Sequence, residues 1–256
     1  MSDIPDAHGS SACAAVVDPR LGLVLHSAAG HPPPLLRDRR GARALSTGRG
    51  LLLGTDPGLP RRTGYQLLDG PGDLVLYTDG VVERRGQDLD EGVLALVSAL
   101  AQPEAVADML VASVPGGGED DAAVIAVALD AVEADCWELP ARLDSLRAAR
   151  SHVAAHCAQR SLAASSCDRL VLACSEAVAN AVEHSGAQRV RLRLWTGAGL
   201  TRALVADDGS WRPPTAGTDR GRGRGVIRQL ADDVIEAATD DGTVVLMSFS
   251  HTGRDR

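Results

Sequence analysis

The sequence contains no lysine, and all 26 of its basic residues are arginine. A Walker A loop and the phosphate-contacting strand of eukaryotic-type protein kinases each require a lysine. Both classes are therefore excluded. Any phosphate binding by this chain must use backbone amides, arginine or a metal ion.

Other absences narrow the class of protein further. Aromatic residues make up only 2% of the chain, so its cores must be built from Val, Leu and Ala. The five cysteines lack C-x-x-C spacing, which favours small core residues in a reducing cytoplasm over a disulfide or zinc framework. No apolar run approaches the length of a membrane span, and the polar start MSDIPDAHGSS is not typical of a signal peptide. The net charge of −8 disfavours a nucleic-acid surface or a polybasic membrane anchor.

The 256 residues fall into two blocks, which predict an α+β protein. The first domain, residues 1–130, is rich in predicted strands around one helical stretch at 91–114. An acidic, non-periodic segment at 131–135 is the predicted linker, and the second domain covers residues 136–256. The strands predicted in the first domain are 12–18, 21–28, 51–54, 65–69, 73–80 and 122–129.

The second domain is predicted to be a two-layer α/β sandwich. A short strand near 136–141 precedes two helices at about 143–160 and 167–184, and Ser165 or Ser166 is the expected cap of the second helix. Two pairs of strands follow, 190–197 with 200–209 and 233–239 with 243–250. The predicted helix at 225–232 lies between these pairs.

Three motifs in the second domain together predict a nucleotide site. Glu176 and Asn180 are four residues apart, so they share one face of the predicted helix. A carboxylate can take a proton there, and an amide oxygen can ligate a hard cation. Asp207 ends a predicted strand in the segment VADDGSW, and GRGRG at 221–225 enters a helix whose first amides can face phosphate.

In this order the motifs resemble the GHKL (Bergerat-fold) ATP-binding domains, and within them the anti-sigma-factor serine kinases of bacteria. The resemblance implies that Glu176 is the general base and that Asn180 ligates an ATP-bound Mg²⁺. It also implies that Asp207 binds the adenine amino group, with Gly209 allowing close approach. Gly221, Arg222 and Gly223 would cradle the phosphates. Trp211 departs from the family pattern, because a second glycine usually stands there.

The first domain resembles the sporulation and stress-response branch of the metal-dependent (PPM-type) serine/threonine phosphatases. The resembling segments are AGHPPPLL at 29–36, GDLVLYTDGVVERRG at 72–86 and EDDAAVIAVAL at 119–129. It implies a partial phosphatase-type β-sandwich with helices. Asp79 and Asp120 match two of the family's Mn²⁺ or Mg²⁺ ligands, with Asp121 as the alternative to Asp120. The family's opening metal aspartates would precede residue 12, where the sequence leaves no room for them, so a defective phosphatase module is expected.

Three functional hypotheses follow from the two resemblances. The first is a cytoplasmic, ATP- and Mg²⁺-dependent serine/threonine kinase of the anti-sigma type, which phosphorylates a small STAS-like antagonist, binds a sigma factor, or does both. The second is a PPM-type phosphatase controlled by its ATP domain, and the third is a non-catalytic binding module gated by ATP. The expected partners are proteins rather than nucleic acid or membrane. The anti-sigma resemblance also leaves a homodimer open.

Overall fold

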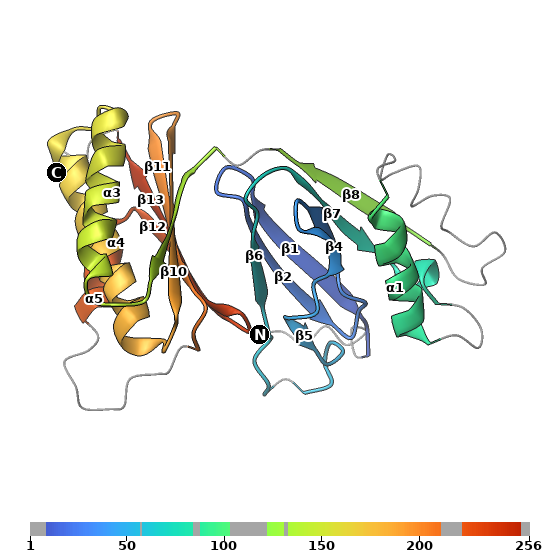
Figure 1. Ribbon diagram of the computed structural model, residues 1–256. Coiled ribbons are helices and arrows are strands. Elements are labelled where there is room, and N and C mark those ends of the chain that lie inside the picture. The colour runs from blue at the N-terminus through green and yellow to red at the C-terminus, as the bar shows by residue number, and fades with distance from the viewer. Residues whose placement is uncertain are drawn as a thin grey trace. The chain divides into compact units, whose positions relative to one another are not determined.

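The computed structural model describes residues 9–56, 58–83, 88–102, 122–130, 133–210 and 222–251. The chain divides into two compact units, Met1–Val132 and Glu133–Arg256. Figure 1 shows strands dominating the first unit, and a sheet with helices forming the second. Each unit is an α+β structure, as the sequence predicts.

Two sheets form the first unit. In one sheet, β2 is the central strand and pairs with β1, β5 and β6. The other sheet has the strand order β4-β3-β7-β8. The strands of the first sheet are β1 (Ala12–Asp18), β2 (Leu23–Ala29), β5 (Arg49–Gly50) and β6 (Gly64–Leu67), and those of the second are β3 (Leu35–Asp38), β4 (Gly41–Ala44), β7 (Gly72–Tyr77) and β8 (Val124–Leu129).

Adjacent residues of the second sheet point to two different cores, because side chains alternate across a strand. Leu36 and Leu74 join Val24 of the first sheet in one buried cluster, so the two sheets pack face to face. Leu35 and Val75 face the other way and pack against helix α1 (Leu89–Leu100). The unit is therefore layered as sheet, sheet and helix, which confirms the predicted β-sandwich with helices.

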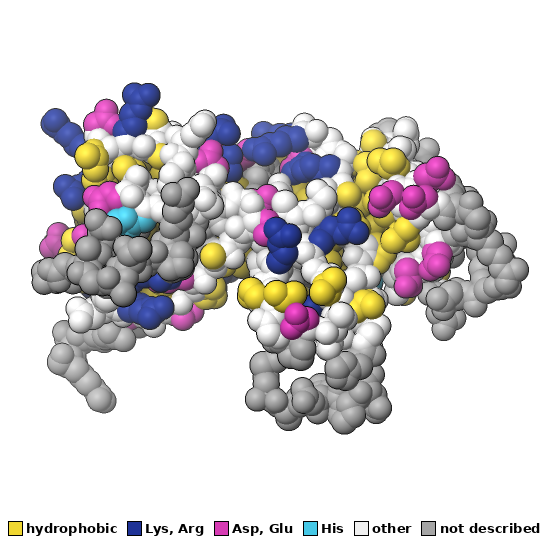
Figure 2. All heavy atoms as spheres, turned by 90° about the horizontal axis from the view of Figure 1, so that it is seen from below, with side chains coloured by type: hydrophobic (Ala, Val, Ile, Leu, Met, Phe, Trp, Pro, Cys, Tyr) yellow, Lys and Arg dark blue, Asp and Glu magenta, His cyan; other side chains and the backbone are white. Residues whose placement is uncertain are grey.

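Helix α1 begins with acidic residues. The Asp88 side chain accepts a hydrogen bond from the Asp90 amide as N-cap, and Asp90 and Glu91 occupy the first turn. Figure 2 shows acidic side chains gathered in the part of the surface where this helix lies. Negative charge there stabilises the helix, since the N-terminal amides carry a partial positive charge.

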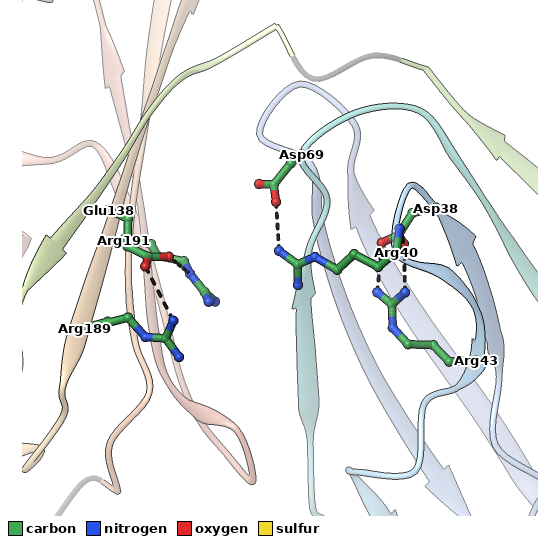
Figure 3. Close-up of polar contacts among 7 residues, drawn as sticks. All are labelled: Asp38, Arg40, Arg43, Asp69, Glu138, Arg189 and Arg191. Atoms are coloured by element: carbon green, nitrogen blue, oxygen red, sulfur yellow. Dashed lines mark hydrogen bonds and ion pairs between the residues drawn. The ribbon is translucent and has the colours of Figure 1, made fainter.

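The β3–β4 hairpin was not predicted from the sequence. Its segment LLRDRRGARA is rich in arginine and lacks β-branched residues, so it has no strand signature. Asp38 closes the hairpin, because its two carboxylate oxygens each accept a 2.8 Å hydrogen bond from Arg43 (Figure 3). The hydrogen bond from the Arg43 side chain is the largest cause of the lowered pKa of Asp38. Conversely, the strand predicted at 51–54 is wrong, since only Arg49–Gly50 forms the short β5.

The second unit contains one five-stranded antiparallel sheet in the order β12-β13-β11-β10-β9. Figure 1 shows the helices of this unit packed on one face of the sheet, so the unit is the predicted two-layer sandwich. The helices are α3 (Ser145–Gln159), α4 (Ala164–His184) and α5 (Arg222–Leu230), and the strands are β9 (Asp135–Pro140), β10 (Arg189–Gly197), β11 (Leu200–Asp207), β12 (Asp233–Thr239) and β13 (Gly242–Ser250).

Two helix starts differ from the prediction. Helix α4 begins at Ala164, so Ser165 and Ser166 lie inside its first turn and neither is the cap. Ala163 is the N-cap and makes no side-chain capping bond. Helix α5 begins at Arg222, three residues before the predicted start at Gly225. Glycine has a poor intrinsic preference for helix, so the repeated glycines led to a predicted start that is too late in the sequence. Asp135, assigned to the linker, is the first residue of β9.

A chain of polar side chains ties the helices to the sheet at the end opposite Asp207. Buried His156 on α3 bonds Asp135 through Nδ1 at 2.6 Å and Thr196 through Nε2 at 2.8 Å. The chain continues from Thr196 to Thr201 and then to His251, each step 2.8 Å long. It joins α3, β9, β10, β11 and the end of β13. None of the helices in the described parts of the chain is long and apolar enough to span a membrane.

Candidate functional site

Helix α4 presents Glu176 and Asn180 on one face, as the four-residue spacing predicts. Both side chains are half-buried. The adjoining face of the helix is buried in the core and fixes its rotation through Ala173, Cys174, Ala177, Val178 and Ala181. Within the described ranges, no hydrogen bond or ion pair engages the Glu176 carboxylate or the Asn180 amide.

Helix α5 brings its first turn against these two side chains. A Cβ atom on Gly223 would lie 3.0 Å from Oε2 of Glu176 and 3.3 Å from Oδ1 of Asn180. Gly223 is not among the positive-φ residues, so a larger residue here would be restricted by these two side chains and not by backbone conformation. The backbone at the start of α5 thus approaches the carboxylate and the amide as closely as a ligand-binding loop would.

The other residues predicted for this end of the site, Gly221 and Arg222, are described only in part. Gly221 lies outside the described residues, as does Trp211, and the side chain of Arg222 is not described. Arg224, a basic residue of the same motif, contacts Glu236 of β12. Its guanidinium is therefore engaged by the sheet.

Asp207 lies at the last position of β11 and is only 5% exposed. Burial raises the pKa of its carboxyl, while hydrogen bonds from the Gly209 and Thr243 backbones and from the Ser185 side chain oppose the rise. The carboxyl group is thus held in a fixed direction by the sheet and by the end of α4. A buried, oriented carboxyl group is suited to reading one polar edge of a ligand.

Gly209 packs against the end of helix α4. A Cβ atom on it would overlap the Ser185 carbonyl oxygen and come within 2.7 Å of Ser185 Oγ. The Ser210 amide donates to the same carbonyl at 2.9 Å, and the Gly209 amide donates to Asp207 at 2.9 Å. Close packing on Ser185, a contact that the sequence did not reveal, therefore requires glycine here, while a role of Gly209 in admitting a ligand stays a prediction.

The neighbouring Asp208 has a different role. It is exposed, and its carboxylate accepts hydrogen bonds from the Gln188 and Arg189 amides at 2.8 and 3.0 Å. Although burial pulls in the other direction, these bonds and the Arg189 side chain lower the pKa of Asp208. Asp208 thus anchors the turn before β10, whereas Asp207 is the buried member of the pair.

Sequence reasoning missed two residues beside Asp207. Thr243 pairs with Asp207 across β11 and β13, so both side chains lie on the same face of the sheet. Its hydroxyl oxygen is buried and has no hydrogen-bond partner among the described residues. Gly242 has a φ of 139°, and a Cβ there would overlap the Asp207 carbonyl oxygen. In the sequence, the turn signal D-D-G at 240–242 pointed to Gly242, but nothing indicated which residue of β11 lies opposite Thr243.

Helix α4 connects the two ends of the candidate site. Ser185, which bonds Asp207, lies five residues beyond Asn180, or about 7.5 Å along the helix axis. Glu176 lies one further turn back. A ligand lying along α4 would meet Asp207 and Thr243 at one end, and Asn180, Glu176 and Gly223 at the other. The candidate site thus has a buried carboxyl end at Asp207 and an end where the first turn of α5 lies against Glu176 and Asn180.

The candidate metal residues of the first unit are only partly placed. Asp79 begins a short 3₁₀ turn after β7, and its carboxylate accepts a 3.0 Å bond from the Gly80 amide. Asp120 and Asp121 lie outside the described residues. Thr78 exchanges two hydrogen bonds with Ala123, so the chain after residue 121 starts beside Asp79. No group of three or more His, Cys, Asp or Glu side chains suited to a metal occurs in the described parts of the chain.

Comparisons with known proteins give a family match for each unit. Residues 139–249 match the family model for the histidine kinase-like ATPase domain. Residues 1–130 match the model for stage II sporulation protein E. A solved structure is also similar, that of the RsbU and RsbW domains of Rv1364c from Mycobacterium tuberculosis. It is 24% identical, the match covers 96% of this chain and 72% of that one, and the TM-score is 0.42.

Proposed function

Because this chain belongs to the stage II sporulation protein E family through residues 1–130 and carries a histidine kinase-like ATPase domain at residues 139–249, we propose that it is an ATP-binding regulator of a bacterial sigma-factor partner switch. In this proposal the second unit is a serine/threonine kinase of the anti-sigma type. Its substrate is a small STAS-like antagonist protein.

One observation carries the proposal, namely the approach of the Gly223 backbone to Glu176 and Asn180. Amides at the start of a helix bind anions, and glycine lets a phosphate come close to them. The Asn180 amide oxygen is a ligand that Mg²⁺ accepts, and this ion would neutralise the negative charge of the phosphates when bound. The open carboxylate, the open amide and the glycine-lined helix start therefore fit a triphosphate with its metal.

The buried end of the site supports adenine as the base. The Asp207 carboxylate can accept a hydrogen bond from an exocyclic amine, and the unpartnered Thr243 hydroxyl can bond a ring nitrogen or a bridging water. Guanine would present a carbonyl oxygen where adenine presents its amine, and the oxygen of a carboxylate would repel it. We therefore expect selectivity for adenine nucleotides.

Glu176 is the proposed general base for phosphotransfer. Its carboxylate would take the proton of a serine or threonine hydroxyl on the antagonist, and that hydroxyl oxygen would attack the γ-phosphorus as ADP leaves. The absence of a described partner leaves this carboxylate able to accept the proton. Asn180 and the start of α5 would hold the phosphates in line with the attacking oxygen.

Binding and transfer can be tested separately. ATP binding to the full chain is measured by calorimetry with and without Mg²⁺, and transfer is followed with labelled ATP and a candidate STAS-like antagonist. We expect Glu176→Gln to bind ATP but to lose transfer by at least a hundredfold. Asn180→Ala should lose most of the Mg²⁺-dependent affinity. Absence of ATP binding by the unmodified chain would refute the proposal. Normal phosphate transfer by Glu176→Gln would refute the role of Glu176, and normal Mg²⁺-dependent ATP affinity in Asn180→Ala would refute that of Asn180.

The third hypothesis, a binding module in which ATP gates contact with the partner, gives a different result. It requires nucleotide-dependent binding of the antagonist, with no phosphate transferred in the presence of ATP and Mg²⁺. The same labelled-ATP assay therefore separates the kinase from the binding module.

A phosphatase activity of the first unit is the second candidate. The family match and the bonds between Thr78 and Ala123, which bring the chain after residue 121 beside Asp79, favour it. The described donors do not form a metal site, so no metal-dependent step is assigned to them. Hydrolysis of a phosphoserine peptide with Mn²⁺, compared between the unmodified chain and Asp79→Asn, tests this candidate. Equal rates would exclude a role for Asp79.

A further inference from the structure

Helix α5 cannot hold its own position by helix propensity. It has nine residues, and two of them, Gly223 and Gly225, are glycine. Isolated helices shorter than about 12 residues are marginal in water, and glycine weakens a helix relative to alanine. Contacts to the rest of the unit must therefore keep its first turn against Glu176 and Asn180.

The last turn of α5 is fixed by helix α4. The Leu230 carbonyl accepts bonds of 2.9 and 2.6 Å from Nε and one terminal nitrogen of Arg169. Arg169 also pairs with Asp232 at 3.3 Å. Ile227, in the middle of α5, is 1% exposed and packs in the core. These contacts secure the C-terminal half of the helix and leave its beginning to other residues.

One carboxylate on the sheet pairs with an arginine near the beginning of α5 and with another in its last turn. Arg224 and Arg228, one helical turn apart, both pair with Oε2 of Glu236 on β12, and the Arg228 contact is 3.7 Å. The Glu236 side chain is only 11% exposed, whereas the two arginines are 44% and 65% exposed. The other carboxylate oxygen, Oε1, is buried and has no partner among the described residues. The fixed element is thus Glu236, and the two arginines bring α5 to it.

We propose that Glu236 is a positioning residue of the nucleotide site, which holds the first turn of α5 against Glu176 and Asn180 through Arg224 and Arg228. The inference rests on the proposed function, because its effect on ligand binding presupposes a nucleotide at this site. Glu236 itself lies on β12 and is assigned no contact with the ligand. Its loss should weaken binding of the phosphates and leave the adenine end intact.

The test compares ATP with adenosine in the full chain. Glu236→Gln keeps the shape of the side chain but removes the charge that attracts both arginines. We expect ATP affinity to fall at least tenfold and adenosine affinity to change less than twofold, because Asp207 and Thr243 lie on β11 and β13. Glu236→Asp, which keeps the charge on a shorter stem, should recover part of the ATP affinity. An equal loss for both ligands would indicate a general structural defect and overturn the proposal, as would unchanged ATP binding.

The chain offers a matched control on the same sheet. Glu138 on β9 also pairs with two arginines, Arg189 at 3.5 Å and Arg191 at 3.1 Å (Figure 3). Glu138→Gln therefore removes one carboxylate from a two-arginine cluster without touching α5. We expect its affinities for ATP and adenosine to match those of the unmodified chain. An ATP loss as large as that of Glu236→Gln would overturn the assignment to Glu236.

A measurement without nucleotide separates this inference from the proposed function. In hydrogen–deuterium exchange, Glu236→Gln should raise the exchange of the α5 amides at least tenfold relative to Glu138→Gln, with α4 unchanged. If the unmodified chain fails to bind ATP but this increase appears, the proposed function is wrong while the role of Glu236 in placing α5 stands. If α5 exchange is the same in both variants, the inference is wrong whatever the nucleotide does.

Discussion

Replacing Gly223 with alanine should separate ligand binding from stability. The added methyl group would lie 3.0 Å from Oε2 of Glu176, closer than an ordinary van der Waals contact. Without a ligand, this oxygen ends a flexible, half-buried side chain that can rotate away at little cost. Alanine also favours the helix over glycine by about 1 kcal/mol. The unliganded protein should therefore be as stable as the unmodified chain or up to about 1 kcal/mol more stable.

The bound state cannot make the same adjustment. With ATP present, the Glu176 carboxylate and the Asn180 amide have fixed tasks, and the methyl group occupies space that the phosphates and their metal need. We expect ATP affinity to fall at least tenfold, which is about 1.4 kcal/mol. Calorimetry gives the affinity, and thermal unfolding gives a midpoint unchanged or raised by about 3 °C.

Gly225 provides the control on the same helix. A Cβ atom there meets no other atom within 4 Å, so Gly225→Ala gains the same helix propensity without contacting the site. It should raise stability and leave ATP affinity unchanged. If Gly223→Ala binds ATP within twofold of Gly225→Ala, the start of α5 is not the phosphate end of the site and the reasoning fails.

Three further changes test other parts of the second unit. Thr243→Val should leave the free energy of unfolding unchanged or raise it by about 1 kcal/mol, because burying a hydroxyl without a partner is costly. Its ATP affinity should fall about tenfold. A marked loss of stability in urea unfolding would show that the hydroxyl has a hydrogen-bond partner. Asp207 has a raised pKa in the fold, so its stabilising contribution is complete below its unfolded pKa of about 3.9 and is lost as the pH rises through the folded pKa. The free energy of unfolding of Asp207→Asn should therefore rise relative to that of the unmodified chain between pH 3 and pH 7. A constant difference across this range would contradict the burial argument. Ser161 and Ala198 each have a φ of 52°, which disfavours side chains, so Ser161→Gly and Ala198→Gly should each raise the free energy of unfolding by about 0.5–1 kcal/mol, and a decrease would show that their side chains make stabilising contacts.

The elements that could be predicted from the sequence are those specified by local patterns. The resemblance to both families is confirmed, and the helix spacing correctly placed Glu176 and Asn180 on one face. The turn Ala198–Gly199 correctly joined two strands, because positive φ angles at both positions suit a two-residue hairpin. Each of these features depends on residues close together in the chain.

The residues that were missed depend on contacts between distant segments. Thr243 reaches Asp207 only through the register of β11 with β13, and Ser185 does so only because the end of α4 packs on the loop after β11. Glu236 meets Arg224 across twelve positions, through the packing of α5 on the sheet. Hydrophobic periodicity reports which face of an element is buried, but it does not report which position on the neighbouring strand lies opposite.

The two ends of the candidate site also differ in how firmly they are supported, and this difference should govern ligand binding. Asp207 and Thr243 belong to β11 and β13, which are both interior strands of the sheet, and the backbone contacts of Ser185 reinforce them. Gly223 belongs to a short helix that owes its position to side-chain contacts. Stability in proteins is distributed unevenly, and elements that rely on few buried contacts open most readily. Base binding should therefore be preorganised, whereas phosphate binding must include the free energy of holding α5 in place. For this reason we expect a substitution in α5 or at Glu236 to lower the affinity for ATP more than the affinity for adenosine, although Glu236 is assigned no contact with the ligand.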